Sequence, residues 1–252
     1  MKVTAKTGIR AANFMVDTFV IIVILLLLAF GCYAMWDSNQ IHNAASPTRY
    51  ERFKPTTDDN GAGFRQLQEI NPDVIAWLNV YGTNIDYPVV QGRDNIKYVN
   101  TNAEGRHSLS GAIFLDYRNS PDFTDFNNIL YGHHMENRVM FGEITSFADA
   151  DYFNARRHGY LYVDGQRHGL EFFAYVQADA NDTRVFRANI TDYEGKQNYL
   201  DMLMDMASIT RDVSVTADDR IVLLSTCSPN STNGRDILVG RIINFVPVNR
   251  FQ

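Results

Sequence analysis

One apolar stretch near the N-terminus constrains this chain more than any other feature. Residues 18–36 are 19 consecutive positions without a formal charge, close to the roughly 20 apolar residues that a helix needs to cross the hydrocarbon core of a bilayer. Lys2, Lys6 and Arg10 precede the stretch, against the single acidic residue Asp17. Because positive residues favour the cytoplasmic side, the sequence predicts a cytoplasmic N-terminus and an extracellular body.

A cleaved signal peptide is the alternative interpretation, since it also begins with basic residues and an apolar run. Small residues do not occupy the A-x-A spacing of a cleavage site, because Ala34 is followed by Met35 and Trp36. Tryptophan in this place is typical of an interfacial anchor. We therefore predict an uncleaved, single-pass anchor over residues 15–36 in the cell membrane, after a cytoplasmic segment over residues 1–14.

The chain has two cysteines, and they are not expected to pair. Cys32 lies inside the apolar stretch and Cys227 near the other end, so no disulfide framework is predicted. Gly31 and Cys32 faintly resemble a lipoprotein processing site, but Ala29 and Phe30 fit that pattern poorly. We interpret Cys32 as a small apolar helix residue, which leaves Cys227 as a lone thiol outside the membrane.

Composition excludes several classes of function. The net charge is −6, and without the basic N-terminal segment the remainder is more acidic still, so it lacks the basic surface of a nucleic-acid binder. One span is too few for a transporter or channel acting alone. The residues after the anchor suffice for one core. We predict a polar spacer or a loosely helical N-terminal arm over residues 37–63, followed by one domain over residues 64–252.

Patterns typical of β-strands dominate this domain. Short runs rich in branched and aromatic residues predict strands at 75–80, 87–90, 111–115, 160–163, 170–176, 221–226 and 237–246. Asp164-Gly165 suits a tight hairpin turn. Helical spacing is limited to a short segment near residues 64–70 and a segment of roughly 15 residues behind the capping-box pair Thr191 and Glu194. The sum is a mostly β body with one inserted helix, for which a barrel is a candidate arrangement.

Cys227 directly follows the apolar run 221–226, so a buried strand delivers this thiol to its exposed end. A nucleophile and a buried structural cysteine both fit that position. Seven turn-forming residues separate Cys227 from Arg235, after which a β pattern resumes. If the two strands pair antiparallel, Arg235 lies opposite the thiol. It would then favour a thiolate and donate to an oxyanion; the alternative is an ordinary surface arginine.

Six histidines compete to be the proton-transfer partner of this thiol. His133 and His134 follow a predicted strand that ends at Tyr131-Gly132, where glycine permits close approach, so one of this pair is the best candidate base. The spacer, a polar loop and the hairpin hold the others: His42, His107, His158 and His168. No metal site is predicted, because adjacent strand residues point to opposite faces and no H-x-x-x-H spacing or cysteine cluster accompanies the pair.

Three separated motifs together resemble the catalytic signature of sortases: Leu224-Ser225-Thr226-Cys227, Arg235 and Tyr131-Gly132-His133-His134-Met135. Further segments resemble class B sortases in particular: Asn71-Pro72-Asp73-Val74-Ile75-Ala76-Trp77, Asp86-Tyr87-Pro88-Val89-Val90-Gln91-Gly92, Gly111-Ala112-Ile113-Phe114-Leu115-Asp116, Met140-Phe141-Gly142 and the helix near residues 193–210. The resemblance covers roughly residues 64–247. It implies a closed eight-stranded sortase-type β-barrel with peripheral helices, anchored on a Gram-positive cell.

The resemblance also implies roles for individual residues. Cys227 corresponds to the nucleophile, Arg235 to the substrate-positioning arginine, and His133, directly after the Tyr-Gly pair, to the catalytic histidine. Oxyanion or substrate-positioning roles are expected for Ser225, Thr226 and Ser228, and substrate-binding roles for His134 and Asn128. The sequence predicts that the backbone N–H of Ser228 can donate to an oxyanion, because the residue without an N–H is Pro229, one position later.

Two departures from the family pattern accompany this resemblance. Leu223 stands where the family often has threonine, a change that leaves the nucleophile assignment intact. Ser228-Pro229 follows the cysteine where class B relatives often carry an acidic residue, which affects the expected loop shape and substrate contacts.

The implied activity is a cysteine transpeptidase. It cleaves a C-terminal sorting signal of a surface protein or pilin through a thioacyl enzyme, and transfers the acyl group to an amine of cell wall precursor or a pilin lysine. A hydrolytic membrane-anchored cysteine peptidase would use the same groups, and a non-catalytic tethered binding domain is a third interpretation. No cofactor is expected, because the acidic residues form no calcium-loop pattern.

Overall fold

The computed structural model describes residues 5–56, 61–229 and 231–245, and it divides into two compact units. The first unit, up to Asn43, consists of helix α1, which runs over Ala5–Ala45. Side chains over residues 8–40 are exposed. The helix is long and apolar enough to cross a membrane. It extends beyond the predicted anchor on both sides, because the flanking residues also favour a helix.

The second unit, from Ala44, is built on a β-barrel. Its described residues form nine strands: β1 (Val74–Val80), β2 (Asp86–Val90), β3 (Ile113–Leu115), β4 (Asn127–Tyr131), β5 (His158–Val163), β6 (Gln166–Asp179), β7 (Ala207–Thr210), β8 (Ile221–Cys227) and β9 (Gly234–Ile243). Eight of them close in the order β5-β1-β2-β3-β4-β8-β9-β6, with β6 pairing back to β5, while β7 attaches to β6. The prediction of a closed eight-stranded barrel is confirmed.

Two of the strand pairs, β2–β3 and β4–β8, are parallel, and the others are antiparallel. The parallel pairs matter for the site. A parallel pair places the carboxyl ends of both strands at the same edge of the sheet, so β4 and β8 deliver the residues that follow them to one place.

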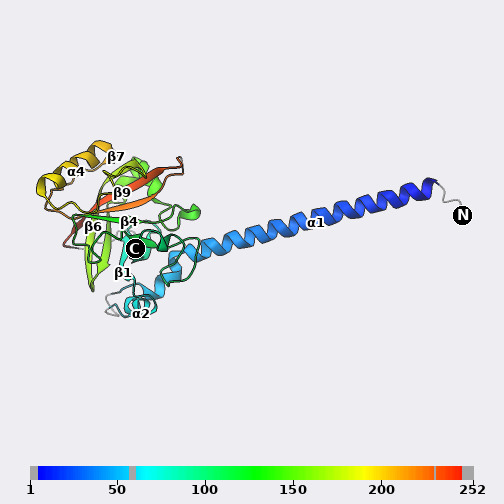
Figure 1. The fold of residues 1–252 in the computed structure, drawn as a ribbon, viewed down its shortest axis with the longest axis horizontal. Helices are drawn as coiled ribbons and strands as arrows, with labels where there is room; N and C mark the ends of the chain where they lie inside the picture. The colour runs from blue at the N-terminus through cyan, green and yellow to red at the C-terminus, as the bar shows by residue number, and fades with distance from the viewer. Residues whose placement is uncertain (1–4, 57–60, 230, 246–252) are drawn as a thin grey trace. The chain divides into compact units, whose positions relative to one another are not determined.

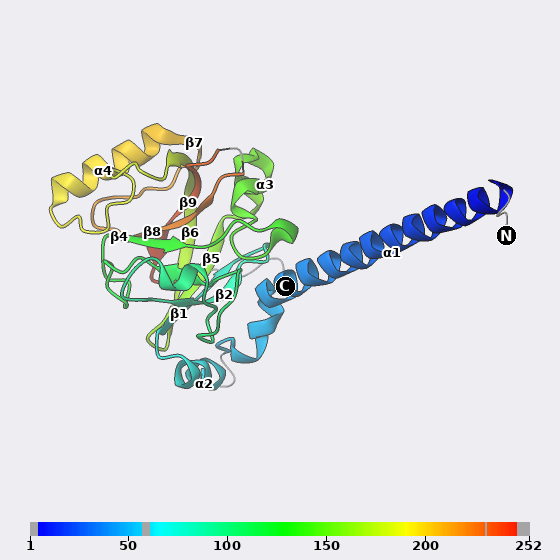
Figure 2. The ribbon, with the colours of Figure 1, turned by 45° about the vertical axis from the view of Figure 1, so that its right-hand side comes forward.

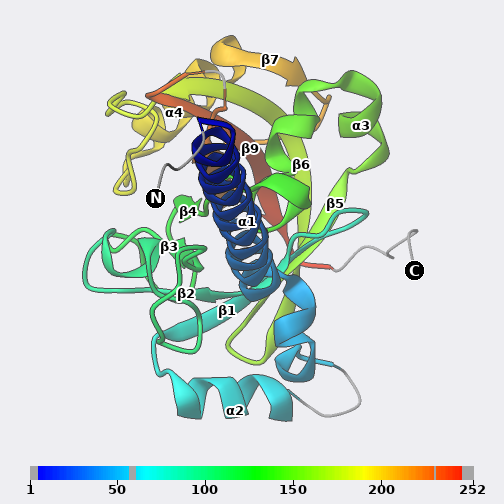
Figure 3. The ribbon, with the colours of Figure 1, turned by 90° about the vertical axis from the view of Figure 1, so that its right-hand side faces the viewer.

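Short helices surround the barrel: η1 (Pro47–Phe53), α2 (Ala62–Ile70), η2 (Lys97–Val99), η3 (Glu136–Arg138), η4 (Ile144–Ala148), α3 (Ala150–Ala155) and α4 (Tyr193–Met206). Figure 1 shows α4 and β7 on one side of the barrel and α2 on the opposite side. Figure 2 and Figure 3 show the same arrangement from two further directions.

Strand β8 shows why the sequence has a continuous apolar run here. Val222 and Leu224 point into the main core, whereas Ile221 and Leu223 belong to a second cluster that includes Leu203 of α4. Alternate residues of a strand face opposite sides. Because the barrel interior covers one face and α4 the other, every position before the thiol is buried.

The predicted hairpin is confirmed. Asp164 and Gly165 have φ angles of 50° and 77°, and Val163 pairs with Gln166 across the turn. These left-handed angles are the ones that a two-residue hairpin turn requires.

The predicted start of the long helix is wrong by one residue. The N-cap of α4 is Asp192, whose side chain accepts a hydrogen bond from the Gly195 N–H at 2.7 Å. Thr191 and Glu194 therefore do not form the expected capping box. A carboxylate at the N-cap also interacts favourably with the helix dipole, which favours Asp192 over the neighbouring hydroxyl.

The compact unit begins earlier than residue 64, where the sequence suggested the domain boundary. Tyr50 and Phe53 of η1 lie in the main core, 4% and 1% exposed. The Tyr87 hydroxyl donates to the Ala45 carbonyl at 2.9 Å. Residues 44–56 are therefore an integral layer of the barrel rather than a spacer, because their aromatic side chains fill space against its strands.

Candidate active site

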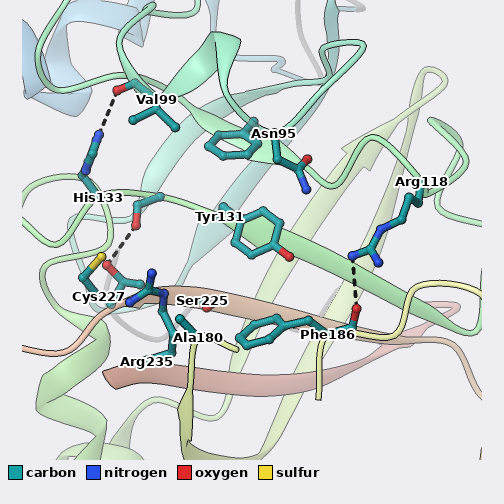
Figure 4. A pocket seen from close by; sticks show the side chains of 13 residues that line it. Asn95, Val99, Arg118, Tyr131, His133, Ala180, Phe186, Ser225, Cys227 and Arg235 are labelled. Carbon is teal, nitrogen blue, oxygen red and sulfur yellow. Dashed lines mark hydrogen bonds between the residues drawn. The ribbon is translucent and has the colours of Figure 1, made fainter. Parts of the chain in front are cut away.

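A pocket of about 450 Å³ opens at the carboxyl ends of β4 and β8. Residues from several connections and strands line it: Asn95, Val99, Phe114, Arg118, Tyr131, Gly132, His133, Ala180, Phe186, Ser225, Thr226, Cys227 and Arg235. Figure 4 shows His133, Cys227 and Arg235 at one end and Asn95 and Arg118 at the other, with Tyr131 between them.

Strands β8 and β9 bring the thiol and the guanidinium together. In their antiparallel register Cys227 lies directly opposite Arg235, as the sequence predicted from the turn between them. Cys227 is the last residue of β8 and its side chain is exposed. The alternative of a buried structural cysteine is therefore wrong. Partial exposure next to a cation is the environment in which cysteines are reactive.

His133 reaches the same end of the pocket through the parallel pairing of β4 with β8. Tyr131 is in register with Ser225, and the next hydrogen bonds run from the Gly132 N–H to the Ser225 carbonyl (3.2 Å) and from the Thr226 hydroxyl to the Gly132 carbonyl (2.9 Å). His133 lies two residues after Tyr131, and Cys227 lies two residues after Ser225, so the parallel strands bring both to the same edge of the sheet.

Gly132 makes that approach possible. A Cβ at this position would lie 2.5 Å from Cδ1 of Ile113 and 2.7 Å from Cδ2 of Phe141. No side chain fits there, so the glycine lets the chain pass between two buried residues before it presents His133.

The imidazole of His133 is held by one backbone group. Its Nε2 lies 2.8 Å from the Val99 carbonyl oxygen, and Figure 4 shows the ring turned towards Val99. A carbonyl oxygen can only accept a hydrogen bond, so Nε2 carries a proton in either charge state of the ring. Nδ1 is therefore the nitrogen that gains or loses a proton.

Of the three expected oxyanion or positioning residues, two line the pocket. Ser225 and Thr226 do so, and the buried hydroxyl of Ser225 has no hydrogen-bond partner among the described residues. Ser228 does not contribute its backbone donor as expected, because its N–H donates to the Gly234 carbonyl at 2.8 Å. That bond closes the connection between β8 and β9, so the expectation of a free Ser228 N–H is wrong.

His134 and Asn128 do not line the pocket, contrary to the expectation of substrate binding. His134 forms an isolated bridge with Met140. Asn128 is fully buried and its side-chain amide donates to the carbonyls of Asp125 and Ile221. Alternation along β4 turns Asn128 away from the pocket-lining Tyr131, and the role of its amide is structural.

Sequence reasoning missed a buried carboxylate that organises the far end of the pocket. Asp116 is fully buried and accepts hydrogen bonds from three lining residues: Arg118 Nε and Nη2 (2.8 and 2.7 Å), the Tyr131 hydroxyl (3.0 Å) and Asn95 Nδ2 (3.0 Å). Burial by itself raises the pKa of Asp116, but hydrogen bonds from Arg118 and Asn95 and the Arg118 charge outweigh it, so the pKa lies below its usual value.

The same carboxylate affects its neighbours. Burial raises the pKa of the Tyr131 hydroxyl, and the Asp116 charge raises it further, so the phenol stays protonated. Arg118 also donates to the Phe186 carbonyl at 3.1 Å. The sequence did contain one indication of this carboxylate, since Asp116 follows a predicted strand and lies two residues before Arg118. The local sequence does not show that Asn95 and Tyr131 also donate to it.

Aromatic rings form the apolar wall of the pocket. The ring of Tyr131 lies 5.4 Å from that of Phe114 and 6.2 Å from that of Phe186, centroid to centroid. The pocket thus combines an apolar wall with a few fixed polar groups, as sites for peptide side chains commonly do. Among the described residues, no three His, Cys, Asp or Glu side chains converge as a metal site would require.

Comparison with known proteins identifies the family of this chain. The family model of the sortase domain matches residues 78–243, somewhat less than the 64–247 suggested by the motifs. The chain belongs to the sortase family. Sortase B of Listeria monocytogenes is 32% identical over 200 residues, which cover 77% of this chain and 80% of that protein.

Two solved structures are also similar. Sortase B from the type II pilus of Streptococcus pneumoniae shares 46% identity with a TM-score of 0.64, covering 73% of this chain and 100% of that one. A Streptococcus pyogenes class B sortase involved in pilus biogenesis shares 39% identity with a TM-score of 0.66, covering 73% of this sortase and 99% of that one. This sortase is therefore a class B cysteine transpeptidase, and its substrates are sorting-signal peptides.

Proposed function

We propose that Cys227, His133 and Arg235 carry out the transpeptidase reaction. The observation that carries this proposal is the shared end of one pocket: Cys227 and Arg235 are opposed in register, and His133 follows the strand that pairs with β8. A thiol, a histidine and a guanidinium at one point are the groups that acyl transfer through a thioester needs.

In the first half-reaction the thiol proton of Cys227 passes to Nδ1 of His133, the sulfur bonds to the carbonyl carbon of the sorting signal, and the carbon–nitrogen bond breaks. The leaving amine takes a proton from His133. In the second half-reaction an acceptor amine attacks the thioester, gives its proton to Nδ1 of His133 and displaces the Cys227 thiolate. Each half-reaction passes through a tetrahedral oxyanion.

The oxyanion is held chiefly by Arg235. One of its N–H groups, on Nη1, donates to the Gly234 carbonyl at 2.9 Å, and a guanidinium has five donors in total. Because the Ser228 N–H is already bonded, the remaining Arg235 donors supply the charge-assisted hydrogen bonds to the substrate.

The acceptor is a pilin lysine rather than cell wall precursor. Support comes from sequence similarity: the two pilus-associated sortases are 46% and 39% identical to this chain, against 32% for the Listeria protein. The enzyme would then join pilin subunits at the cell surface.

The apolar helix α1 anchors the enzyme in the cell membrane, with residues 1–14 in the cytoplasm, residues 15–36 in the bilayer and the catalytic domain outside. Support comes from the length of the uncharged stretch and from the basic residues Lys2, Lys6 and Arg10 before it. An anchor of this kind would hold the enzyme where secreted substrates leave the membrane.

The test uses the full chain in detergent micelles and a library of sorting-signal peptides, with mass spectrometry of the products. A thioester on Cys227 is expected, followed by transfer to a lysine-bearing peptide in preference to a glycine-ended one. Cys227→Ala should abolish cleavage while the fold is retained. Hydrolysis alone with every amine would contradict the transfer, and full activity of Cys227→Ala would contradict the role of the thiol.

A further inference from the structure

The imidazole of His133 depends on the position of a single carbonyl, that of Val99, at 2.8 Å. Val99 ends η2, in the long connection between β2 and β3, and no strand pairing holds it in place. The carbonyl must therefore be fixed by the packing of that connection.

Gly111, near the other end of the same connection, packs directly against this carbonyl. A Cβ on Gly111 would lie 2.5 Å from the carbonyl oxygens of both Val99 and Tyr98, closer than any real Cβ contact. The glycine also has a φ of +59°, in the left-handed region. Two independent features thus exclude a side chain here.

The backbone of Gly111 cannot move away from these carbonyls, because hydrogen bonds hold the three residues that follow it in place. The Ala112 N–H donates to the Tyr98 carbonyl at 3.0 Å. Ile113 and Phe114 then pair with Val89 and Val90 of β2 in the barrel. An added methyl group would therefore displace the Val99 carbonyl rather than the glycine backbone.

We propose that Gly111 is a positioning residue for the transpeptidase reaction: its missing side chain lets the Val99 carbonyl stand where it holds Nε2–H of His133. The inference rests on the proposed role of His133. In this arrangement Gly111 touches no substrate, and it acts on catalysis only through the carbonyl and the ring.

The test compares Gly111→Ala with Gly105→Ala in the full chain. Gly105 belongs to the same connection and has a similar φ of +79°, but a Cβ there would meet only Asn71 Cγ at 3.9 Å. Both variants carry the backbone cost of a left-handed alanine, and only Gly111→Ala adds the clash. We expect kcat of Gly111→Ala to fall about 10- to 100-fold with a much smaller change in KM, since misplacement of a catalytic group costs about that much. Gly105→Ala should keep the parent kcat.

A second readout follows the ring directly. Imidazole ¹⁵N spectra, with the His133 signals assigned by their loss in His133→Gln, should show the Nε2–H tautomer in the parent chain and a tautomer mixture in Gly111→Ala. This signal is independent of whether His133 is catalytic, which the activity of His133→Gln tests separately. An Nδ1–H tautomer in the parent chain would overturn the inference, as would equal losses of kcat in both glycine variants.

If Gly111→Ala does not fold, the carbonyl itself is altered. An ester in place of the peptide bond between Val99 and Asn100 weakens the Val99 oxygen as an acceptor without adding an atom at Gly111. We expect at least a tenfold fall in kcat. An unchanged kcat would mean that the carbonyl does not position the ring, and the inference would fail.

Discussion

At the residue scale, the chemistry of the pocket depends on which donors and acceptors the backbone has already used. The Ser228 N–H already donates to the Gly234 carbonyl. The donors that lie opposite Cys227 are those of the Arg235 guanidinium. The Val99 carbonyl likewise occupies Nε2 of His133, so Nδ1 is the ring nitrogen to which we assign proton transfer in the proposed reaction.

Arg235→Lys should lower kcat/KM by about 100-fold, the scale of losing an oxyanion donor. A lysine ammonium lacks the planar fork that lets one group donate to the Gly234 carbonyl and to the substrate together. Steady-state kinetics on a sorting-signal peptide measures this. Arg241→Lys is the matched control, because Arg241 lies on the same strand but binds Glu171 outside the pocket. Similar losses in both variants would contradict a specific role for Arg235.

Asp116→Asn should raise KM and destabilise the fold by about 1–3 kcal/mol at pH 7, because the buried carboxylate that accepts from Arg118, Tyr131 and Asn95 is replaced by an amide with fewer acceptor sites. The pKa of Asp116 lies below its usual value, despite burial, because of Arg118 and Asn95. The carboxylate therefore stabilises the fold above its unfolded pKa of about 3.9, and this contribution is lost as the pH falls through the lower folded pKa.

Denaturant unfolding of both proteins at several pH values checks this. The difference in free energy of unfolding should be largest near neutral pH and shrink below about pH 4. Asp182→Asn is the control, since Asp182 forms the same Asp-x-Arg contact with Arg184 at an exposed position and should matter little. A pH-independent difference for Asp116→Asn would refute the account.

At the element scale, helix α4 covers the outer face of the strands that bear the site. Leu200 and Leu203 pack in the cluster that holds Leu223 of β8 and Val239 of β9. The start of this helix therefore affects how firmly the strands of Cys227 and Arg235 are held from outside.

Asp192→Ala should destabilise the domain by about 1 kcal/mol, because it removes the N-cap acceptor for the Gly195 N–H. Thr191→Ala is the discriminating comparison, since the capping-box motif assigned the cap to Thr191. Thermal unfolding should show a lower Tm for Asp192→Ala only. A larger effect of Thr191→Ala would restore the sequence-based cap.

At the scale of the whole molecule, the barrel is completed by the segment that joins it to the apolar helix. Arg49 pairs with the buried Glu104 at 2.5 Å, and Lys54 with Asp86 at 2.5 Å. Together with Tyr50 and Phe53 in the core, these contacts make residues 44–56 part of the fold.

A chain that begins at Ala44 should keep the stability and peptide activity of the full protein, because the unit from Ala44 has its own core. A chain that begins at Ala62 should unfold more than about 10 °C lower, since loss of buried Phe53 alone costs about 3–5 kcal/mol. Thermal unfolding of the two chains decides this. Equal melting temperatures would show that residues 44–56 are a spacer after all.

Much of the site was predictable from local pattern. The uncharged stretch, the Asp164-Gly165 hairpin and the opposition of Cys227 to Arg235 all depend on residues close together in the sequence. A strand period of two and a short turn fix which residues face each other, so these features follow without knowledge of the rest of the fold. The sortase motifs supplied His133 by resemblance.

Only the tertiary structure decided the remainder. The pairing of β4 with β8 joins strands some 90 residues apart, and the connection between β2 and β3 brings Val99 and Gly111 to His133. Asp116 likewise collects donors from Asn95, Arg118 and Tyr131. Such contacts depend on which strands close the barrel, a long-range choice set by packing of the whole core. The sequence by itself determined the candidate reacting groups, because they lie in local motifs, and the closed barrel determined what holds them in position.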